Sequence, residues 1–397
     1  MLRLLSRTLP AMAVLLQAAS PAPVDERGGP LKVVATTTNA AGQVIDWVEP
    51  QSQGRIASPP PVSPFEKRDG RAMSAAMVIP ADPAMNGPEG TVPILRSGGP
   101  TLPTKRLPEP GDDGLARNNN NNETRAAAPS FAGQHWYASS GQVVANRGGR
   151  ARFSLYRPYV QSGSDFSLLQ TAVIRRSAAH AGGTGRVTQT VEAGWINYPN
   201  QVQPPHLFAF YTTNGYRGDG DGVGGWNRDR AGWVQVDRLI YPGVPFGPLS
   251  ADGGGQYEVE IGFLLYQGNW WLWAVDRYVG YYPGSLFAGG GVDRADTLAA
   301  GADAINFYGE IFNSVPWMTT TDMGSGRFPE SGFGHAAFIR NIVYVDPAGA
   351  RRDYDGGAQI VVSDRARYRL QTAFRSGSSW GSYVFLGGPG AGGVVGG

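Results

Sequence analysis

The chain has 397 residues, with 34 Lys and Arg against 32 Asp and Glu, a formal net charge of +2 and no cysteine. Balanced charge without a long basic block gives no reason to expect nucleic acid or an anionic membrane as a partner, and the lack of cysteine excludes disulfides, thiol nucleophiles and cysteine metal ligands. With 57 glycines, 30 prolines, 11% aromatic and only 17% charged residues, the composition favours a β-rich protein with many turns.

The N-terminus has the layout of a secretory signal peptide. Arg3 and Arg7 precede an apolar run at 9–16, and small residues follow at 18–20. A basic start, an apolar centre and a small-residue end are typical of such peptides, so we predict a signal peptide over residues 1–22 and a secreted protein. No later apolar run reaches the roughly 18 to 20 residues that a membrane-spanning helix needs.

Residues 23–129 are mostly spacer. Short extended segments are predicted at 43–48 and 88–96, and Pro-rich sequence separates them. The stretch 97–130 is rich in Pro, Gly, Asp and Ala and contains five consecutive asparagines at 118–122. Such a composition buries too little apolar surface to fold alone, which indicates a linker.

From residue 131 onward the sequence alternates between apolar and polar positions in many short runs. Turn residues separate these runs at short intervals, as in a sandwich or barrel. We therefore predict an all-β fold, an antiparallel β-sandwich of two packed, curved sheets that is jelly-roll-like, with one short helix at 293–301 and a mobile Gly-rich end at 387–397. The predicted strands are residues 134–138, 151–160, 167–175, 185–197, 207–213, 233–240, 257–266, 270–275, 304–312, 336–345 and 358–362.

The run at 187–198 carries a carboxylate on a polar strand face. Successive side chains of a strand point to opposite faces, so Thr190 and Glu192 share one face while Val191, Ala193 and Trp195 share the other. A single strand glutamate is usually only solvated. The question that this strand raises is whether another strand supplies a second carboxylate.

A second strand supplies one. In the run at 304–313, alternation places Asn306, Tyr308, Glu310 and Phe312 on one face. Two strands thus each carry one glutamate among hydroxyl, amide and aromatic side chains. If the two faces form one groove, the carboxylates are a pair.

Several separated motifs resemble those of the neprosin family of glutamic peptidases, in the same order and with similar spacing. They are Gln-His-Trp-Tyr-Ala at 134–138, Glu-Ala-Gly-Trp at 192–195, Leu-Phe at 207–208 with Tyr-Thr at 211–212, Gly-Tyr-Tyr-Pro at 280–283 with Leu-Phe at 286–287, Gly-Glu-Ile-Phe-Asn at 309–313 and Met-Gly-Ser-Gly-Arg-Phe-Pro-Glu-Ser-Gly-Phe at 323–333. Gly-Gln-Val-Ile-Asp at 42–46 and Pro-Glu-Gly-Thr-Val-Pro-Ile at 88–94 resemble the activation propeptide of that family.

The resemblance implies an acid-active endopeptidase that cuts after proline and is made as a zymogen, and we expect neither a cofactor nor a metal. It implies a propeptide with its linker at 23–129 and a catalytic β-sandwich at 130–397, with Glu192 and Glu310 as the catalytic pair. We expect a monomer whose partners are proline-containing peptides and its own propeptide. The chain departs from plant members at 218–232, where it lacks their cysteine pair.

Two carboxylates at one site repel each other, so one pKa rises and the pair shares a proton at acidic pH. The ionised member can then take a proton from the attacking water, and the protonated member can serve the oxyanion or the leaving amine. From the sequence we assign the base to Glu192 and the acid to Glu310.

Further residues are candidates for substrate contact or processing. The aromatic candidates could cradle a proline ring, although core packing explains a buried ring equally well, and hydroxyl or amide groups could complete an oxyanion site. The substrate-binding candidates are Trp195, Tyr211, Thr212, Tyr308, Phe312 and Asn313. The Pro129–Ser130 bond is the predicted cleavage position, since it follows a proline in the linker.

Other chemistries have weaker signals. A Gly-x-Ser-x-Gly motif at 377–381 has no histidine after it, as a hydrolase triad of that type requires, and the four histidines include no His-Glu-x-x-His motif. Two alternatives stay open. The same glutamate pair would suit a secreted β-sandwich glycoside hydrolase, or both glutamates could serve a non-catalytic carbohydrate-binding protein.

Overall fold

The computed structural model describes residues 29–61, 85–96, 105–109, 130–181, 183–217, 224–374 and 379–397. The expected signal peptide, Pro129 and most of the predicted linker lie outside these ranges. The described residues form β-strands and short 3₁₀ turns, with no α-helix among them. No helix in the described part of the chain is long and apolar enough to cross a membrane.

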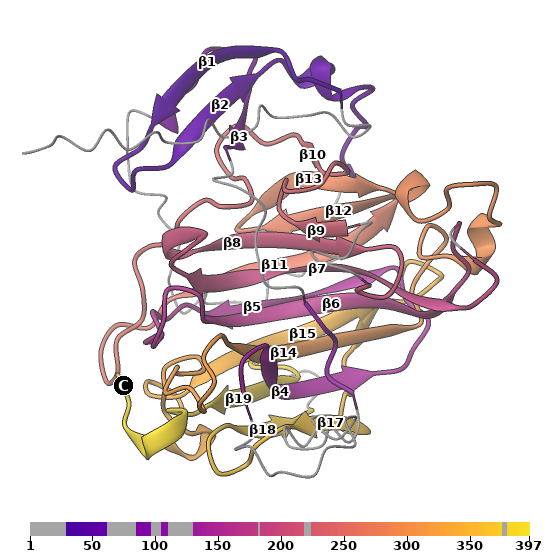
Figure 1. The fold of residues 1–397 in the computed structure, drawn as a ribbon. Coiled ribbons are helices and arrows are strands. Elements are labelled where there is room, and N and C mark those ends of the chain that lie inside the picture. The colour runs from indigo at the N-terminus through magenta and orange to yellow at the C-terminus, as the bar shows by residue number, and fades with distance from the viewer. Residues whose placement is uncertain are drawn as a thin grey trace, which may run out of the picture.

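Three antiparallel strands form a small N-terminal sheet in the order β1-β2-β3 (Figure 1). They are β1 (Val33–Thr38), β2 (Val44–Val48) and β3 (Val92–Leu95). The segment predicted at 43–48 is therefore extended, and the one predicted at 88–96 is extended over 92–95 and forms a turn at 89–90. Ile45 and Trp47 of β2 are fully buried in the main core of the molecule, which anchors this sheet to the sandwich.

A seven-stranded antiparallel sheet forms one layer of the sandwich. Its order is β17-β4-β14-β6-β7-β8-β9, so β6 lies between β14 and β7. In chain order the strands are β4 (Gln134–Gln142), β6 (Phe166–Ala178), β7 (Val187–Tyr198), β8 (Val202–Thr212), β9 (Gly224–Trp226), β14 (Ala304–Asn313) and β17 (Gln359–Val362).

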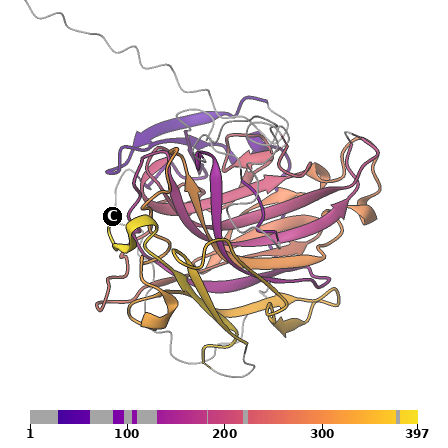
Figure 2. The same cartoon turned by 60° about the horizontal axis from the view of Figure 1, so that its bottom comes forward.

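A nine-stranded sheet forms the other layer (Figure 2), in the order β10-β13-β12-β11-β5-β15-β19-β18 with β16 paired to β15. Its strands are β5 (Gly148–Ser154), β10 (Val234–Gln235), β11 (Glu258–Tyr266), β12 (Asn269–Ala274), β13 (Arg277–Pro283), β15 (Ala337–Val345), β16 (Arg351–Asp353), β18 (Arg369–Ala373) and β19 (Tyr383–Gly387). The 3₁₀ turns are η1 (Pro50–Gln53), η4 (Gly284–Leu286), η5 (Arg294–Asp296), η6 (Pro329–Ser331) and η7 (Ala391–Gly393).

Alternate side chains of the two sheets meet in one hydrophobic core. Val191 and Trp195 of β7 pack there with Phe307 of β14, and Phe153 and Phe263 come from the facing sheet; all five are fully buried. The Trp195 indole donates a hydrogen bond to the Ser154 carbonyl oxygen at 2.9 Å, so its polar atom is satisfied inside the core. The predicted all-β sandwich is confirmed.

Two local expectations are wrong. The helix expected at 293–301 is only the turn η5. The Asp296 N–H donates to the Asp293 carbonyl, and side chains take the groups at Leu298, whose N–H donates to Gln189 and whose carbonyl accepts from Trp270. The Gly-rich end is also ordered. Its backbone bonds to the sandwich at Ala391, whose N–H donates to the Thr319 carbonyl, and at Gly396, whose N–H donates to Asp322.

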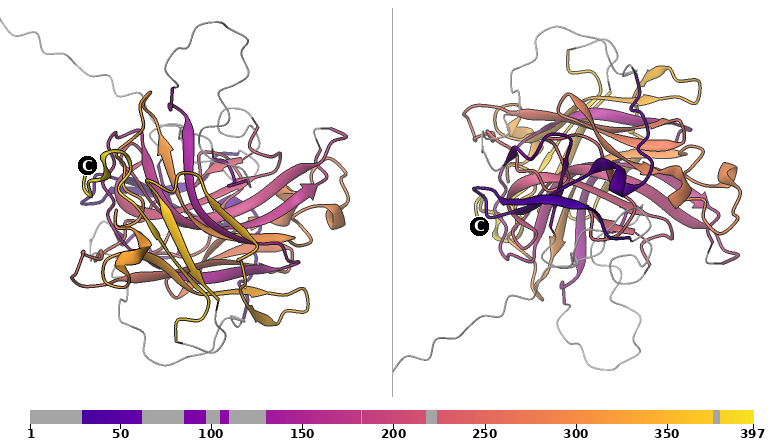
Figure 3. Two further views of the ribbon diagram at one scale, coloured as in Figure 1. Left: turned by 90° about the horizontal axis from the view of Figure 1, so that it is seen from below. Right: turned by 90° about the horizontal axis from the view of Figure 1, so that it is seen from above.

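The N-terminal sheet lies at the end of the sandwich beside β10 and β13, and it crosses that end in the view from above (Figure 3). Several of its contacts use uncharged groups. Gln53 donates to the Gln235 carbonyl and accepts the Gln235 N–H, both at 2.8 Å, and Gln43 donates to the Gly243 carbonyl at 2.8 Å. Gln53 thereby pairs with the backbone of the edge strand β10.

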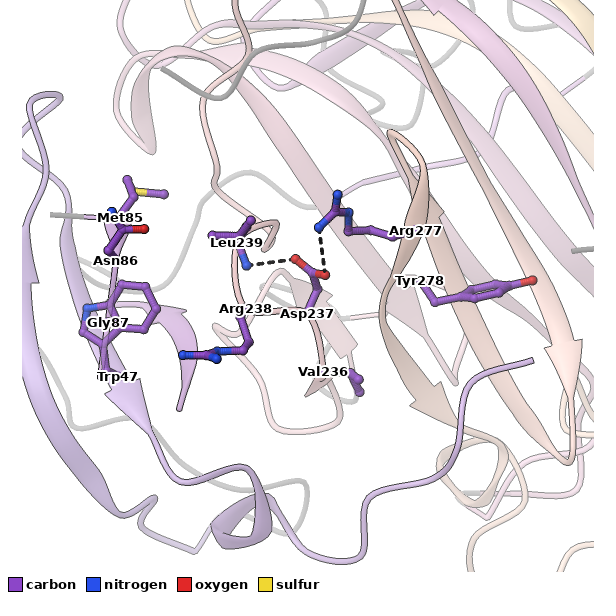
Figure 4. A pocket seen from close by; sticks show the side chains of 10 residues that line it. All are labelled: Trp47, Met85, Asn86, Gly87, Val236, Asp237, Arg238, Leu239, Arg277 and Tyr278. Atoms are coloured by element: carbon purple, nitrogen blue, oxygen red, sulfur yellow. Dashed lines mark hydrogen bonds and ion pairs between the residues drawn. The ribbon is translucent and has the colours of Figure 1, made fainter. Parts of the chain in front are cut away.

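A cavity of about 510 Å³ separates part of the N-terminal sheet from the sandwich (Figure 4). Trp47 and the stretch 85–87 line it from one side, and residues 236–239 with 277–278 line it from the other. Its acidic residue, Asp237, already binds the Leu239 N–H and the Arg277 side chain. Glu192 and Glu310 do not line it.

Candidate active site

Strand register brings Glu192 and Glu310 to the same outward face of the seven-stranded sheet. Glu192 of β7 lies opposite Ala172 of β6, and Glu310 of β14 lies opposite Leu168 on the other side of β6. Gln170 stands between these two positions on the same face of β6. Both glutamates are fully buried.

A single ammonium group bridges the two carboxylates. Lys105 Nζ lies 2.6 Å from Glu310 Oε2 and 3.5 Å from Glu192 Oε2, and it donates to Gln170 Oε1 at 2.8 Å. The lysine comes from the short stretch 105–109, which crosses the face of the sheet in front of β6 (Figure 1). The two carboxylates therefore lie within reach of one small group placed between them.

Aromatic rings enclose the same ammonium. Its nitrogen lies 5.3 Å from the Trp226 ring centroid, 5.5 Å from Phe208 and 5.9 Å from Tyr308. A cation over ring faces gains electrostatic attraction that burial strengthens. Lys105 itself is only 1% exposed, so a buried cation is here compensated by two carboxylates, an amide oxygen and three rings.

Neutral donors surround Glu192. Its Oε1 accepts from the Thr190 hydroxyl at 2.8 Å and from the Tyr216 hydroxyl, and its Oε2 accepts from Gln170 Nε2 at 2.8 Å and from the Tyr308 hydroxyl at 3.3 Å. Burial, reinforced by the charges of both glutamates, raises the pKa of Tyr308 well above its usual value, so this hydroxyl stays a neutral donor.

Glu310 is held differently, between two nitrogen bases. Besides Lys105, His135 Nδ1 of β4 lies 2.6 Å from Glu310 Oε1. Burial penalises the charged form of Glu310, but the Lys105 charge and the His135 hydrogen bond outweigh that penalty, so the pKa of Glu310 lies below the usual glutamate value. The positive neighbours thus favour an ionised Glu310.

The structure unites some of the predicted site residues. Glu192, Glu310, Tyr308 and Phe312 share the outward face of the sheet, and the Phe312 ring centroid lies 5.1 Å from that of His135. Thr212 lies opposite Thr190 in the register and its Oγ1 accepts the Tyr216 N–H at 3.2 Å, so it positions the tyrosine that binds Glu192.

Other predicted site residues lie elsewhere. Trp195 and Tyr211 point into the core between the sheets, where they pack and cannot contact a substrate on the outward face, so these two expectations are corrected. Asn313 binds the carbonyl oxygens of Val315 and Trp317 and shapes the loop after β14. Ser130 is exposed, and Pro129 lies outside the described residues.

Sequence patterns do not single out Lys105, Gln170 or Tyr216 as site residues, and His135 lies in a family motif to which no role was assigned. Gln170 had a signal, since it is a lone amide among apolar residues on a predicted buried strand, where an unsatisfied amide is costly. Lys105 had none, because only the folded chain brings it to the carboxylates.

No group of three or more His, Cys, Asp or Glu side chains in the described residues could hold a metal ion. The histidines are dispersed. Burial lowers the pKa of His206 to about 4, and its ring binds Gln201, while His335 binds the half-exposed Asp252.

Comparison with known proteins gives one family. A family model described as Neprosin matches residues 163–389, which include both glutamates. Among solved structures, scytalido-glutamic peptidase with a transition state analog inhibitor aligns with 9% identity and a TM-score of 0.32, covering 64% of this chain and 98% of that chain. SCP-B, a member of the eqolisin family of peptidases in a complex with the tripeptide Ala-Ile-His, aligns with 8% identity and a TM-score of 0.30 over the same shares.

Proposed function

The chain belongs to the neprosin family, and from this premise we propose that it is a secreted, acid-active glutamic endopeptidase that cuts peptide bonds on the C-terminal side of proline. One observation carries the proposal. Glu192 and Glu310, which come from strands on either side of β6, converge on one ammonium nitrogen at 3.5 Å and 2.6 Å.

Without the ammonium, a water molecule and a scissile carbonyl would occupy the space between the carboxylates. At acidic pH the pair keeps one proton, because two adjacent buried carboxylates do not both ionise cheaply. One carboxylate then removes a proton from the water, and the other donates to the oxygen of the attacked carbonyl. Tyr308 is a neutral hydroxyl beside Glu192 and can support that oxygen.

We also propose that residues 23–129 form an inhibitory propeptide with its linker, and that Lys105 is the group that blocks the site. Its ammonium occupies the position of the attacking water and pairs with both carboxylates. Because a neighbouring cation lowers the pKa of Glu310, this pairing is complete at neutral pH and weakens as pH falls towards that lowered pKa. Acid would thus weaken the block and start self-processing, with Pro129–Ser130 as the expected bond.

The test is a digest of proteome-derived peptides at about pH 3 to 5, where a carboxylate dyad keeps one proton. The full chain is compared with Glu192→Gln and Glu310→Gln. We expect cleavage after proline by the wild type and a loss of about 10² to 10⁴-fold in kcat/KM in each variant. A β-glucan assay under the same conditions separates the glycosidase alternative.

Two results would reject the proposal. A wild type that cleaves no peptide after acid incubation is one, and variants that retain activity are the other. If purified Glu192→Gln still loses its propeptide, the cleavage does not depend on the catalytic pair. That result would reject only the proposal of autocatalytic processing, because a pure sample contains no other protease.

A further inference from the structure

The two glutamates have unlike partners, although both are fully buried on one sheet face. Glu192 is bound by hydroxyls and an amide, whereas Glu310 is bound by Lys105 and His135. If Lys105 leaves when the enzyme matures, His135 is the described side chain that stays within hydrogen-bond distance of Glu310 and that can carry a positive charge. The asymmetry between the glutamates then depends on this ring.

We propose that His135 is a positioning residue that, as an imidazolium, holds Glu310 in its ionised form, so that Glu310 acts as the general base and Glu192 as the general acid. This inference rests on the proposed peptidase function. It reverses the assignment that the sequence suggested.

The charged ring of His135 restricts the protonation state of Glu310. An imidazolium has a proton on both ring nitrogens and only donates, so at acidic pH Glu310 Oε1, 2.6 Å from His135 Nδ1, must act as an acceptor. A histidine is ordinarily charged in that pH range. A proton on Glu310 Oε1 would oppose the N–H of the ring, and the positive charge disfavours protonation of the other oxygen as well.

The partners of Glu192 allow the opposite. Thr190 Oγ1 and the Tyr216 hydroxyl lie 3.1 Å apart and either can donate to the other. A hydroxyl both donates and accepts, so this pair can reorient to receive a proton from a neutral Glu192 carboxyl. The surroundings of Glu192 therefore tolerate both protonation states, while those of Glu310 favour only the carboxylate.

Packing fixes the histidine ring. Its centroid lies 6.2 Å from Tyr137 with the planes nearly parallel, 6.0 Å from Phe166 and 5.1 Å from Phe312. The titratable groups near the ring are Glu310 from β14, Tyr137 from its own strand and Lys105 from the 105–109 stretch, whereas β6 presents the apolar Phe166. The side chain is 6% exposed, so the ring is desolvated but not sealed from protons.

The reaction balances without another reagent. The Glu310 carboxylate takes a proton from water as its oxygen bonds to the carbonyl carbon, and the carbonyl electron pair moves to oxygen, which takes the proton of Glu192. On collapse the C–N bond breaks, the amine nitrogen takes the proton from Glu310, and one hydroxyl of the intermediate returns a proton to Glu192. The products are an acid and an amine, and both glutamates regain their starting states.

The test is the pH profile of kcat/KM on a proline-containing peptide, since that ratio reports the ionisations of the free enzyme. The wild type is expressed as the full chain and processed by acid incubation, and it is compared with His135→Asn treated in the same way. The asparagine keeps a donor near the Nδ1 position but carries no charge. We expect the acidic limb to move up by about one pH unit or more, because an adjacent opposite charge lowers a carboxyl pKa by about 1 to 3 units. His135→Gln should move it in the same direction.

His335→Asn is the matched control. His335 also lies 2.6 Å from a carboxylate, Asp252, but on the exposed surface. We expect its profile to match the wild type. If His135→Asn also leaves the acidic limb in place, the inference is overturned while the peptidase proposal stands; if the wild type shows no peptidase activity, the peptidase proposal itself has failed.

A second measurement needs no His135 variant. A ¹³C NMR titration of the glutamate carboxyls in the acid-processed wild type, with Glu310→Gln and Glu192→Gln used for assignment, gives the order in which they ionise. We expect Glu310 to lose its proton at lower pH than Glu192. The reverse order overturns the inference even if His135→Asn fails to fold.

Discussion

At the scale of single residues, the candidate site is a buried charge cluster that is satisfied almost completely. Lys105 brings one positive charge to two carboxylates, and His135 and Gln170 fill remaining positions around them. A buried charge that loses its partner is far more costly than an exposed one. The stability of the whole chain should therefore respond strongly to Lys105.

Lys105→Met should lower the free energy of unfolding of the full chain by about 3 to 5 kcal/mol near neutral pH, because it removes the ammonium that bridges two buried carboxylates. The pKa of Glu310 is lowered in the folded state, so the pairing stabilises above the usual glutamate pKa of about 4 and is lost as pH falls through the lowered value. The difference in free energy of unfolding between the wild type and Lys105→Met should therefore shrink towards about pH 3. Thermal melts across pH measure it.

Lys32→Met is the matched control for this measurement. Lys32 also lies 2.6 Å from a glutamate, Glu49, but the two side chains are 69% and 43% exposed. An exposed pair contributes about 0 to 1 kcal/mol. Equal effects of the two substitutions would contradict the buried ion pair described for Lys105.

At the scale of elements, the loop after β14 is fixed by one buried carboxylate. Asp165 is fully buried and accepts from the Ser314 N–H at 2.8 Å and from the hydroxyls of Ser314, Thr319 and Thr321. β14 ends at Asn313, three residues after Glu310, and the loop follows directly. Its anchoring therefore sets where β14 ends beside the candidate site.

Asp165→Asn should destabilise the protein by about 1 to 3 kcal/mol, because an amide group cannot accept all of these hydrogen bonds and leaves buried hydroxyls unpaired. The pH limbs of peptidase activity should stay in place, since Asp165 does not touch either glutamate in the described contacts. Melting temperature and the pH profile are measured together. A shifted limb with unchanged stability would contradict a purely structural role.

At the scale of the whole molecule, the N-terminal sheet and the 105–109 stretch are attached to the sandwich by different kinds of contact. Uncharged pairs such as Gln53 with Gln235 help to dock the N-terminal sheet, whereas Lys105 holds its own stretch to the site by charge. The first kind of contact is insensitive to acid and the second is sensitive. Acid should therefore loosen the blocking stretch before it loosens the N-terminal sheet.

Gln53→Ala should make the N-terminal sheet easier to remove, because it leaves the Gln235 N–H and carbonyl without their partners, at a cost of about 1 to 3 kcal/mol. Limited proteolysis at neutral pH should release the 29–61 region faster than in the wild type. Ser52→Ala is the control, since its hydroxyl bonds only to the Glu49 carbonyl within the η1 turn. Equal release rates would show that docking does not depend on Gln53.

The sequence predicts the sandwich because its central strands alternate cleanly. In β7 and β14, period two separates Glu192 and Glu310 from the core residues, and the structure confirms these faces. The sequence does not predict β1, β9, β13, β16, β18 or β19, and polar residues or glycine interrupt the apolar pattern in β9, β13, β16 and β18.

The errors at the site have physical causes too. Trp195 stands three residues from Glu192, an odd spacing that places it on the opposite face of β7, and Tyr211 pairs with the core residue Val191. A motif shared with a family does not reveal on which face of the strand a side chain lies, whereas the alternation of apolar and polar residues does. Lys105 could not be predicted, since a buried lysine is stable only where distant strands supply its partners.

The position of β6 between β7 and β14 has a consequence for how this site could change. The two carboxyl-bearing strands are held apart by one intervening ladder, with neighbouring strands roughly 4.8 Å apart. This backbone spacing sets the distance between the two carboxylates, and point substitutions in the cleft do not change it. A descendant that needed a wider or narrower gap would have to recruit its acid from a different strand.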